Sequence, residues 1–129
     1  MKKKATAAWA LSAAMAVLMA FPAFADTGWV RNGDVWSYYR ADGSRAASTW
    51  IKNGDALFYV DENGAMVVNT WKTEDGATYW LDGSGTAASG WEEIDGKWYY
   101  FDETTHIMAT EMYVGSNYVG EDGAWIVGK

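Results

Sequence analysis

The chain of 129 residues has no cysteine and only one proline and one histidine. Without cysteine, neither a disulfide bond nor thiolate chemistry can contribute to its stability or function. A lipid-anchored cysteine is excluded for the same reason. The sequence also lacks a metal-ligand cluster, a phosphate-binding loop and a nucleophile motif. We therefore expect no metal site, no cofactor and no enzymatic activity.

The remaining residues that could act in acid–base catalysis favour the same conclusion. His106 is the single histidine and lies in the polar loop DETTHIM, which favours a side chain that faces the solvent. Glu92 and Glu93 are adjacent, so in a strand they point to opposite faces and do not form a pair. Three aspartates recur once in each repeat described below, which indicates a role in shaping loops: Asp61, Asp82 and Asp102.

Basic residues are also scarce. The chain has 10 Lys and Arg against 17 Asp and Glu, a net charge of −7. Three of the lysines, Lys2 to Lys4, begin the chain, and their removal would change the net charge from −7 to −10. Such an acidic protein is not expected to bind nucleic acid or anionic membranes. It suits a cationic or neutral partner.

The N-terminus has the pattern of a secretory signal peptide. The three lysines precede a largely apolar run from residue 5 to 24, which ends in the small-large-small sequence 23–25. We expect residues 1–25 to be cleaved after Ala25 and the protein to be secreted. The alternative is a retained membrane anchor, because about 20 apolar residues can span a bilayer. A secreted protein without disulfides points to a bacterial source.

Residues 26–129 are organised by an internal repeat. Four tryptophans, Trp29, Trp50, Trp71 and Trp91, follow one another at intervals of 21, 21 and 20 residues. An aromatic residue follows each of them nine positions later, and we expect these to be structural: Tyr38, Tyr59, Trp80 and Tyr100. The repeats lie near 28–49, 50–70, 71–90 and 91–111, and a degenerate unit at 112–129 is expected to cap the array.

Each repeat is predicted to be a β-hairpin. The turn dipeptides are Asn-Gly at 32–33 and 53–54 and Asp-Gly at 75–76 and 95–96, all suited to tight two-residue turns. In the strand after the last turn, Trp98 and Tyr100 point to one face and Tyr99 and Phe101 to the other, so both faces are apolar. An isolated hairpin cannot cover two such faces. We therefore predict an all-β fold, a solenoid of stacked β-hairpin repeats of about 20 residues.

The segments GWEEIDGKWYYFD (90–102) and YVGEDGAW (118–125) resemble the cell-wall-binding repeats of the choline-binding protein family. The related glucan-binding repeats of secreted glucosyltransferases are similar as well. The resemblance covers residues 28–129. In that family, choline lies between consecutive hairpins, held by the leading Trp, the first ring of the following triplet and a ring from the next hairpin. Ring faces suit a quaternary ammonium group because it attracts them by cation–π interaction.

The resemblance implies two aromatic cages. The first and most complete has Trp29, Trp36 and Phe58, with Trp50 close by. The second and third would lack a ring, because Leu57 and Thr78 stand where the family has an aromatic. The fourth has Trp91 and Trp98, and Asn117 lies near the position of the third ring. Three residues could complete it: Met112, Tyr113 or Tyr118.

The function predicted from these features is non-catalytic binding of the bacterial cell wall, through choline residues of teichoic acids or another wall glycan. The protein is expected to be secreted and wall-associated, with no nucleic-acid partner and no membrane insertion after signal cleavage. One alternative is a glucan-binding module that stacks sugars on exposed Trp. Another is a structural solenoid that binds a protein partner.

Overall fold

The structure is a computed structural model that describes residues 27–129. The predicted signal peptide, residues 1–25, lies outside the described residues. Residues 27–129 contain eleven β-strands and no helix. In this part of the chain, accordingly, no helix is long and apolar enough to cross a membrane. The prediction of an all-β fold is confirmed.

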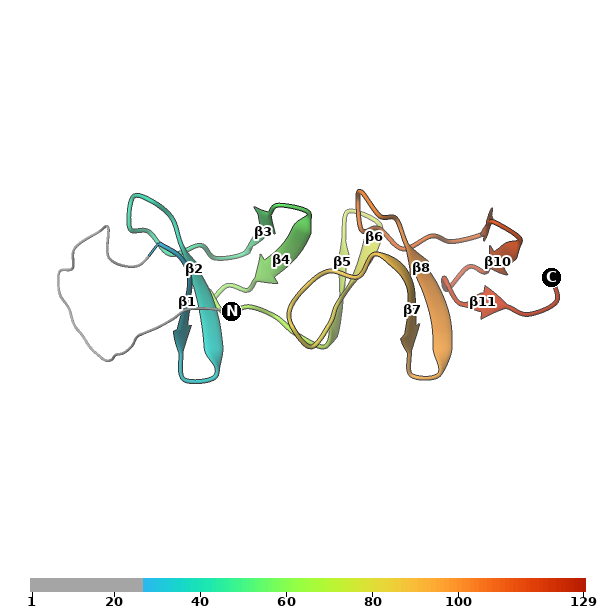
Figure 1. Cartoon of the computed structure of the whole chain (residues 1–129), viewed down its shortest axis with the longest axis horizontal. Helices are drawn as coiled ribbons and strands as arrows, with labels where there is room; N and C mark the ends of the chain where they lie inside the picture. Colours follow the sequence, from blue (N-terminus) through green and yellow to red (C-terminus); the bar gives the residue numbers. More distant parts are fainter. Residues whose placement is uncertain (1–26) are drawn as a thin grey trace. The chain divides into compact units, whose positions relative to one another are not determined.

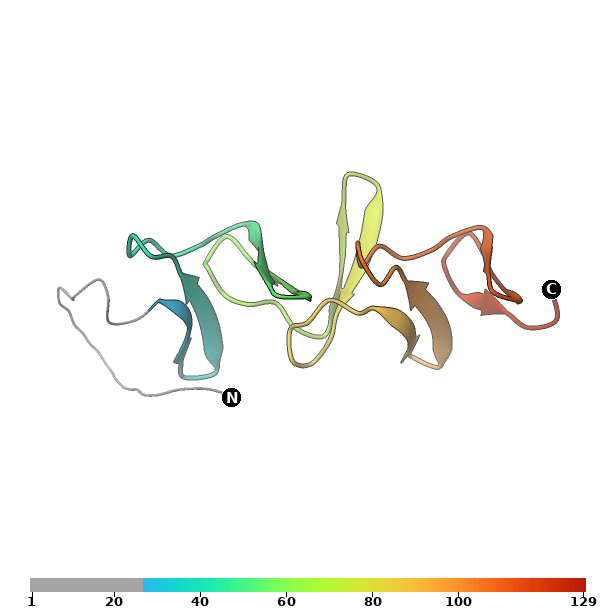
Figure 2. The same cartoon turned by 45° about the horizontal axis from the view of Figure 1, so that its top comes forward.

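The strands form consecutive antiparallel hairpins, as the repeat predicts (Figure 1). The pairs are β1 (Gly28–Asn32) with β2 (Val35–Tyr39), β3 (Thr49–Asn53) with β4 (Ala56–Val60), β5 (Thr70–Glu74) with β6 (Ala77–Leu81), and β7 (Gly90–Ile94) with β8 (Lys97–Phe101). The last unit is a three-stranded sheet of β9 (Met112–Val114), β10 (Asn117–Val119) and β11 (Trp125–Ile126). Figure 2 shows β5–β6 and β7–β8 as adjacent arrows, each pair joined by a tight turn.

The first two turns differ from the prediction by one residue. Asn32 pairs with Val35, so the two loop residues of β1–β2 are Gly33 and Asp34, not Asn32 and Gly33. The turn of β3–β4 is likewise at 54–55. In both turns only the first loop residue, a glycine, has a positive φ, as in a type II′ turn. The turns at 75–76 and 95–96 have positive φ at both residues and are type I′ turns, as an Asp-Gly pair favours.

The recurrent aspartates shape the loops that follow β4, β6 and β8, as predicted. The Asp102 carboxylate accepts hydrogen bonds from the amides of Thr105 and Thr104, both at 2.8 Å. These bonds, with that from Thr105 the stronger influence, hold the pKa of Asp102 below its ordinary value. Asp61 and Asp82 accept amide hydrogen bonds in the same way in their own loops. The recurring aspartate therefore has a structural role.

The first repeat has Arg40 at that position, and Asp42 takes over the role. Its carboxylate accepts hydrogen bonds from the hydroxyl of Ser44 at 2.7 Å and from the amide of Ser44 at 2.9 Å. The hydroxyl bond first, and then the amide bond, lower the pKa of Asp42.

The described chain forms two compact units, residues 27–51 with 58–67 and residues 52–57 with 68–129. In the first unit, Trp29, Tyr38 and Phe58 pack against a buried cluster of Ala46, Ile51 and Val60. In the second unit, Trp80, Tyr99 and Met108 pack against a buried cluster of Ala88, Ile94 and Phe101. Within each unit, one face of a hairpin therefore covers a face of the next, which is how stacked hairpins bury the rings on both of their faces.

The structure corrects the expectation that His106 faces the solvent. Its side chain is 7 % exposed, and its Nδ1 lies 3.3 Å from the carbonyl oxygen of Ala88. The residue also has a positive φ of 67°, because it closes the tight loop that follows β8. The polar sequence around it gave no sign of burial, since the contact is with a residue 18 positions earlier. His106 thus packs against the loop of the preceding repeat.

Candidate functional site: an aromatic cavity in the C-terminal repeats

The hairpin β7–β8 places two tryptophans on one face. Trp91 lies opposite Tyr100 and Glu93 opposite Trp98 in the antiparallel register. Residues opposite each other in a hairpin share a face, and so do residues two positions apart in one strand. Trp91 and Glu93 are two positions apart, and Trp98 is opposite Glu93, so Trp91 and Trp98 lie on the same face. The other face carries Ile94 and Phe101, which are buried in the core. The two indoles are therefore available for contacts away from this core.

These two indoles line a cavity of about 180 Å³ together with Asn117 and Trp125. Trp98 and Trp125 are 40 % and 37 % exposed, respectively, so the cavity is open to solvent. Three of the four lining side chains are indoles, and the fourth is an uncharged amide. The cavity thus offers flat aromatic faces without a formal charge.

The terminal sheet supplies the two remaining walls. Asn117 and Val119 are two positions apart in β10, so their side chains lie on the same face of the sheet. Trp125 of β11 pairs with Val119, which places Trp125 on this face as well. An antiparallel bridge between Tyr99 and Ala124 holds the start of β11 beside β8. This bridge brings Trp125 within reach of the cavity.

Of the residues predicted for the fourth cage, the structure brings together Trp91 and Trp98, and Asn117, near the position of the expected third ring, lines the cavity with them. Met112 and Tyr113 do not line the cavity and are 48 % and 55 % exposed. Tyr113 instead contacts Tyr118, with ring centroids 5.0 Å apart. The ammonium group of Lys129 lies 4.9 Å from the centroid of the same Tyr118 ring.

Sequence reasoning missed Trp125 as a wall of the cavity. A signal was present, because Asp122-Gly123-Ala124-Trp125 repeats the order of a loop followed by the leading Trp of a further hairpin. The last unit is shorter than the other repeats, so Trp125 does not stand at the interval of 20 or 21 residues that marks the leading tryptophans. The pairing of β10 with β11 places Trp125 on the same face as Asn117.

In the first predicted cage, other rings pack closely around the leading tryptophan, Trp29. The Trp29 ring meets the Phe58 ring edge-on at 5.2 Å and the Tyr38 ring at 5.3 Å. All three pack on the buried cluster of the first unit. The Trp29 Nε1 is buried and has no hydrogen-bond partner among residues 27–129. Trp29 and Phe58 are thus part of this unit's core.

The other members of the first cage have separate contacts. Trp36 is half-buried, and its carbonyl oxygen accepts a hydrogen bond from the amide of Met66 at 2.8 Å. Trp50 contacts Tyr59, with ring centroids 5.0 Å apart.

In the third repeat, Trp71 contacts Tyr99 edge-on at 5.1 Å. Thr78 stands where a ring was expected, and its hydroxyl lies 3.3 Å from that of Thr73. Trp71 remains 38 % exposed.

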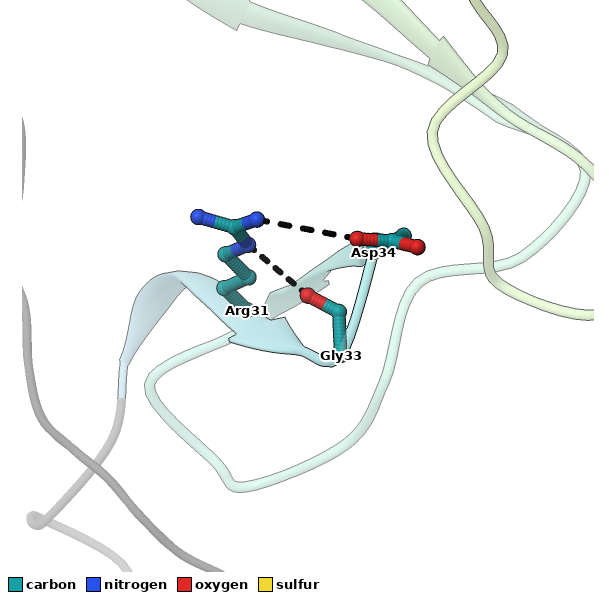
Figure 3. Close-up of polar contacts among 3 residues, drawn as sticks. All are labelled: Arg31, Gly33 and Asp34. Atoms are coloured by element: carbon teal, nitrogen blue, oxygen red, sulfur yellow. Dashed lines mark hydrogen bonds and ion pairs between the residues drawn. The ribbon is translucent and has the colours of Figure 1, made fainter.

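The charge beside the aromatic residues differs between the first and the fourth repeat. Arg31 lies opposite Trp36 in the register of β1–β2, whereas Glu93 lies opposite Trp98 in β7–β8. Arg31 is held at the hairpin end, because its Nε donates a hydrogen bond to the carbonyl of Gly33 at 2.8 Å and its guanidinium lies 3.7 Å from the Asp34 carboxylate (Figure 3).

Among the described residues, no group of three or more His, Asp and Glu side chains is placed to hold a metal ion. The described residues contain hairpin repeats and an aromatic cavity. Both agree with the comparison with known families. The family model of the choline-binding repeat matches residues 71–113, and a second model, of a cell wall binding repeat, matches residues 27–44 and 48–66.

The chain belongs to the choline-binding repeat family. Together the two models cover more than half of it. The assignment to a choline-binding, cell-wall-binding repeat protein made from the sequence is confirmed, and these repeats are a binding region.

Solved structures of choline-binding proteins are similar to the chain. CbpJ from Streptococcus pneumoniae is 31 % identical, with a TM-score of 0.69 over 78 % of this chain and 35 % of that one. Choline-binding protein F from the same organism, solved in the presence of a peptidoglycan analogue, is 29 % identical with a TM-score of 0.68, over 78 % and 33 %. The pneumococcal cell wall endolysin from phage Cp-1, in complex with choline, is 29 % identical with a TM-score of 0.59, over 64 % and 24 %.

The chain of this choline-binding repeat protein thus spans about a third or less of each of these structures. A sequence comparison with curated proteins finds no match.

Proposed function

We propose that this protein binds the bacterial cell wall without catalysis, through choline residues of teichoic acids. The observation that carries the proposal is the cavity lined by Trp91, Trp98, Trp125 and Asn117. The same proposal includes secretion after cleavage at Ala25 and residence at the wall.

The chemistry of the cavity suits a quaternary ammonium group. Such a group carries a positive charge but has no N–H to donate, so a carboxylate or carbonyl cannot hold it by hydrogen bonding. Aromatic faces attract it, and each ring contributes roughly 0.5–2 kcal/mol. With three indoles, one cavity is expected to bind choline near millimolar, or about −4 kcal/mol.

A millimolar site is useful only on a polymer that carries many copies of the ligand. Once one choline residue is bound, further sites on the same chain bind at a high effective concentration, so the overall affinity exceeds that of a single cavity. Teichoic acid decorated with choline is such a polymer. The ligands named for the related structures, choline for the phage endolysin and a peptidoglycan analogue for choline-binding protein F, support the same class of target.

Retention on a tertiary-amine resin tests the proposal. The purified protein is applied at neutral pH and eluted with free choline. We expect retention and choline-dependent release of the wild-type protein and weaker retention of Trp98→Ala. A Tyr113→Ala variant is the matched control, because Tyr113 is exposed and does not line the cavity. Passage of the folded wild-type protein through the resin without delay would contradict the proposal.

One observation favours a second candidate, the glucan-binding module. Trp71 is 38 % exposed and could stack against a sugar ring. Titration of the tryptophan fluorescence with an α-glucan and with choline separates the two candidates. A response to the glucan that Trp71→Ala abolishes, without any response to choline, would favour glucan binding. A structural solenoid predicts no response to either ligand.

A further inference from the structure

Glu93 lies directly opposite Trp98 in the register of β7–β8. Directly opposite residues in an antiparallel pair share a face of the sheet, and their Cβ atoms are roughly 4.5–5.5 Å apart. Trp98 uses this face to line the aromatic cavity. Glu93 is therefore on the same face of the hairpin as Trp91 and Trp98, next to a residue that lines the cavity.

This carboxylate is available to act on a ligand. Glu93 is exposed, and within residues 27–129 no ion pair joins it to a Lys or Arg side chain. The walls of the cavity, three indoles and one amide, carry no formal charge. Glu93 thus adds a negative charge beside a cavity that is otherwise uncharged.

The same register position has other residues in other hairpins. In β1–β2 it is Arg31, opposite Trp36, and in β5–β6 it is Thr73, opposite Thr78. The Arg31 guanidinium is fixed by Gly33 and Asp34 next to the strand that carries Trp36 (Figure 3). The residue opposite Trp36, Thr78 or Trp98 is therefore positive in the first repeat, neutral in the third and negative in the fourth.

From this we infer that Glu93 is a specificity-determining residue, which strengthens the preference that the indole faces give the C-terminal cavity for a positively charged ammonium ligand over a neutral molecule of the same shape. The inference rests on the proposed function. Indole faces contact a trimethylammonium group and a neutral tert-butyl group over the same apolar surface, so shape alone separates them poorly. A carboxylate on the same face of the hairpin adds a Coulomb attraction that only the charged ligand experiences. In the first repeat no such attraction is expected beside Trp36, because the residue at this position is Arg31, whose charge is offset by the Asp34 carboxylate.

The test compares choline with 3,3-dimethylbutan-1-ol, in which carbon replaces the quaternary nitrogen. Binding is followed by NMR as the shift of the Trp98 indole N–H in the full chain, for wild type, Glu93→Gln and Glu93→Arg. Glu92→Gln is the matched control, since the neighbouring carboxylate lies opposite Tyr99 on the other face. We expect Glu93→Gln to weaken choline binding about two- to fivefold, Glu93→Arg to weaken it further, and Glu92→Gln to change it little. Affinity for the neutral alcohol should stay unchanged in all three variants.

Salt provides an independent readout. The difference between wild type and Glu93→Gln should shrink as ionic strength rises, because mobile ions screen exposed charges. Equal choline affinity of wild type and Glu93→Gln at low salt, or equal weakening of both ligands, would overturn the inference alone. Absence of any choline response in the wild-type protein would overturn the proposed function together with it.

Discussion

Trp98 and Trp125 line the same cavity, although they belong to different antiparallel sheets, β7–β8 and β9–β11. Neither tryptophan is fully buried, and each is more than a third exposed. A folding core would bury such rings more completely, because their large apolar area is costly to expose to water. Their partial exposure around one cavity is therefore the main structural argument for a binding role.

Replacement of Trp125 should weaken choline binding. Trp125→Ala removes one of three aromatic walls, and the loss of one cation–π contact of roughly 0.5–2 kcal/mol corresponds to an affinity about two- to thirtyfold lower. The affinity is measured by an NMR titration of the Trp91 indole. Met112→Ala, a change in the same terminal sheet outside the cavity, should have little effect. Equal affinities of Trp125→Ala and wild type would remove Trp125 from the site.

Phe58 should be needed for stability more than for binding. It is half-buried against Trp29 and the cluster of Ala46, Ile51 and Val60, so Phe58→Ala leaves part of this core unfilled. We expect the free energy of unfolding to fall by about 2–3 kcal/mol, measured by urea denaturation. Val35→Ala, at a position 45 % exposed in β2, is the control and should change it by less than about 0.5 kcal/mol. A similarly small effect of Phe58→Ala would indicate that the ring is not part of the core.

Gly123 should be intolerant of a side chain. Its φ is +86°, and a Cβ at this position would overlap the sulfur of Met108. Gly123→Ala is expected to lower the free energy of unfolding by about 2–3 kcal/mol, from backbone strain and overpacking together. Gly115→Ala is the matched control, because Gly115 also has a positive φ but open space around it, so only the strain of about 1 kcal/mol remains. Thermal unfolding of both variants measures the difference, and equal losses would show that the contact with Met108 does not matter.

The loop aspartates should make stability depend on acid pH. The pKa of Asp102 is lower in the folded protein than its ordinary value of 3.8, because the amides of Thr105 and Thr104 stabilise the charged form. The stabilisation is complete above that ordinary value and is lost as pH falls through the lower folded pKa. Asp102→Asn should therefore be less stable than wild type at pH 7, and the gap should narrow below pH 3.8.

Urea unfolding between pH 7 and pH 2 measures this gap. Asp55→Asn serves as the control, since the Asp55 carboxylate in the β3–β4 turn accepts no hydrogen bond within residues 27–129. A gap between Asp102→Asn and wild type that stays constant with pH would contradict the assignment.

Much of the fold follows from local patterns in the sequence. The interval of 20 or 21 residues between Trp29, Trp50, Trp71 and Trp91 predicts one hairpin per repeat, and each of these residues lies in the first strand of a hairpin. Asp-Gly at 75–76 and 95–96 predicts the turns correctly, because a type I′ turn requires positive φ at both residues. The Asn-Gly turns were misplaced by one residue, since the following Gly-Asp pair accepts a type II′ turn that keeps the register of β1 and β2.

The candidate site could be predicted only in part. Trp91 and Trp98 follow from the alternation of a single hairpin, whereas Asn117 is named in the sequence only as the residue near the position of the missing third ring. Met112, Tyr113 and Tyr118 are the candidates for the missing wall in the sequence, but the register of β9 and β10 places Tyr113 opposite Tyr118, and their rings are in contact. The burial of His106 was missed for a similar reason, since its partner Ala88 belongs to the preceding repeat.

Patterns within single repeats are sufficient to predict the all-β class, the number of hairpins, the role of the loop aspartates and the family. All of these depend on residues within one repeat, where alternation and turn chemistry act over a few positions. Which aromatic rings belong to the core and which line a cavity depends instead on the packing between hairpins. Trp29 and Trp91 occupy the same position in their repeats, yet the neighbour of Trp29 is the packed ring of Phe58, while Trp91 faces a cavity shared with Asn117 and Trp125. The difference arises because packing between hairpins depends on the shape of the following unit, and the last unit of this chain is a compressed sheet.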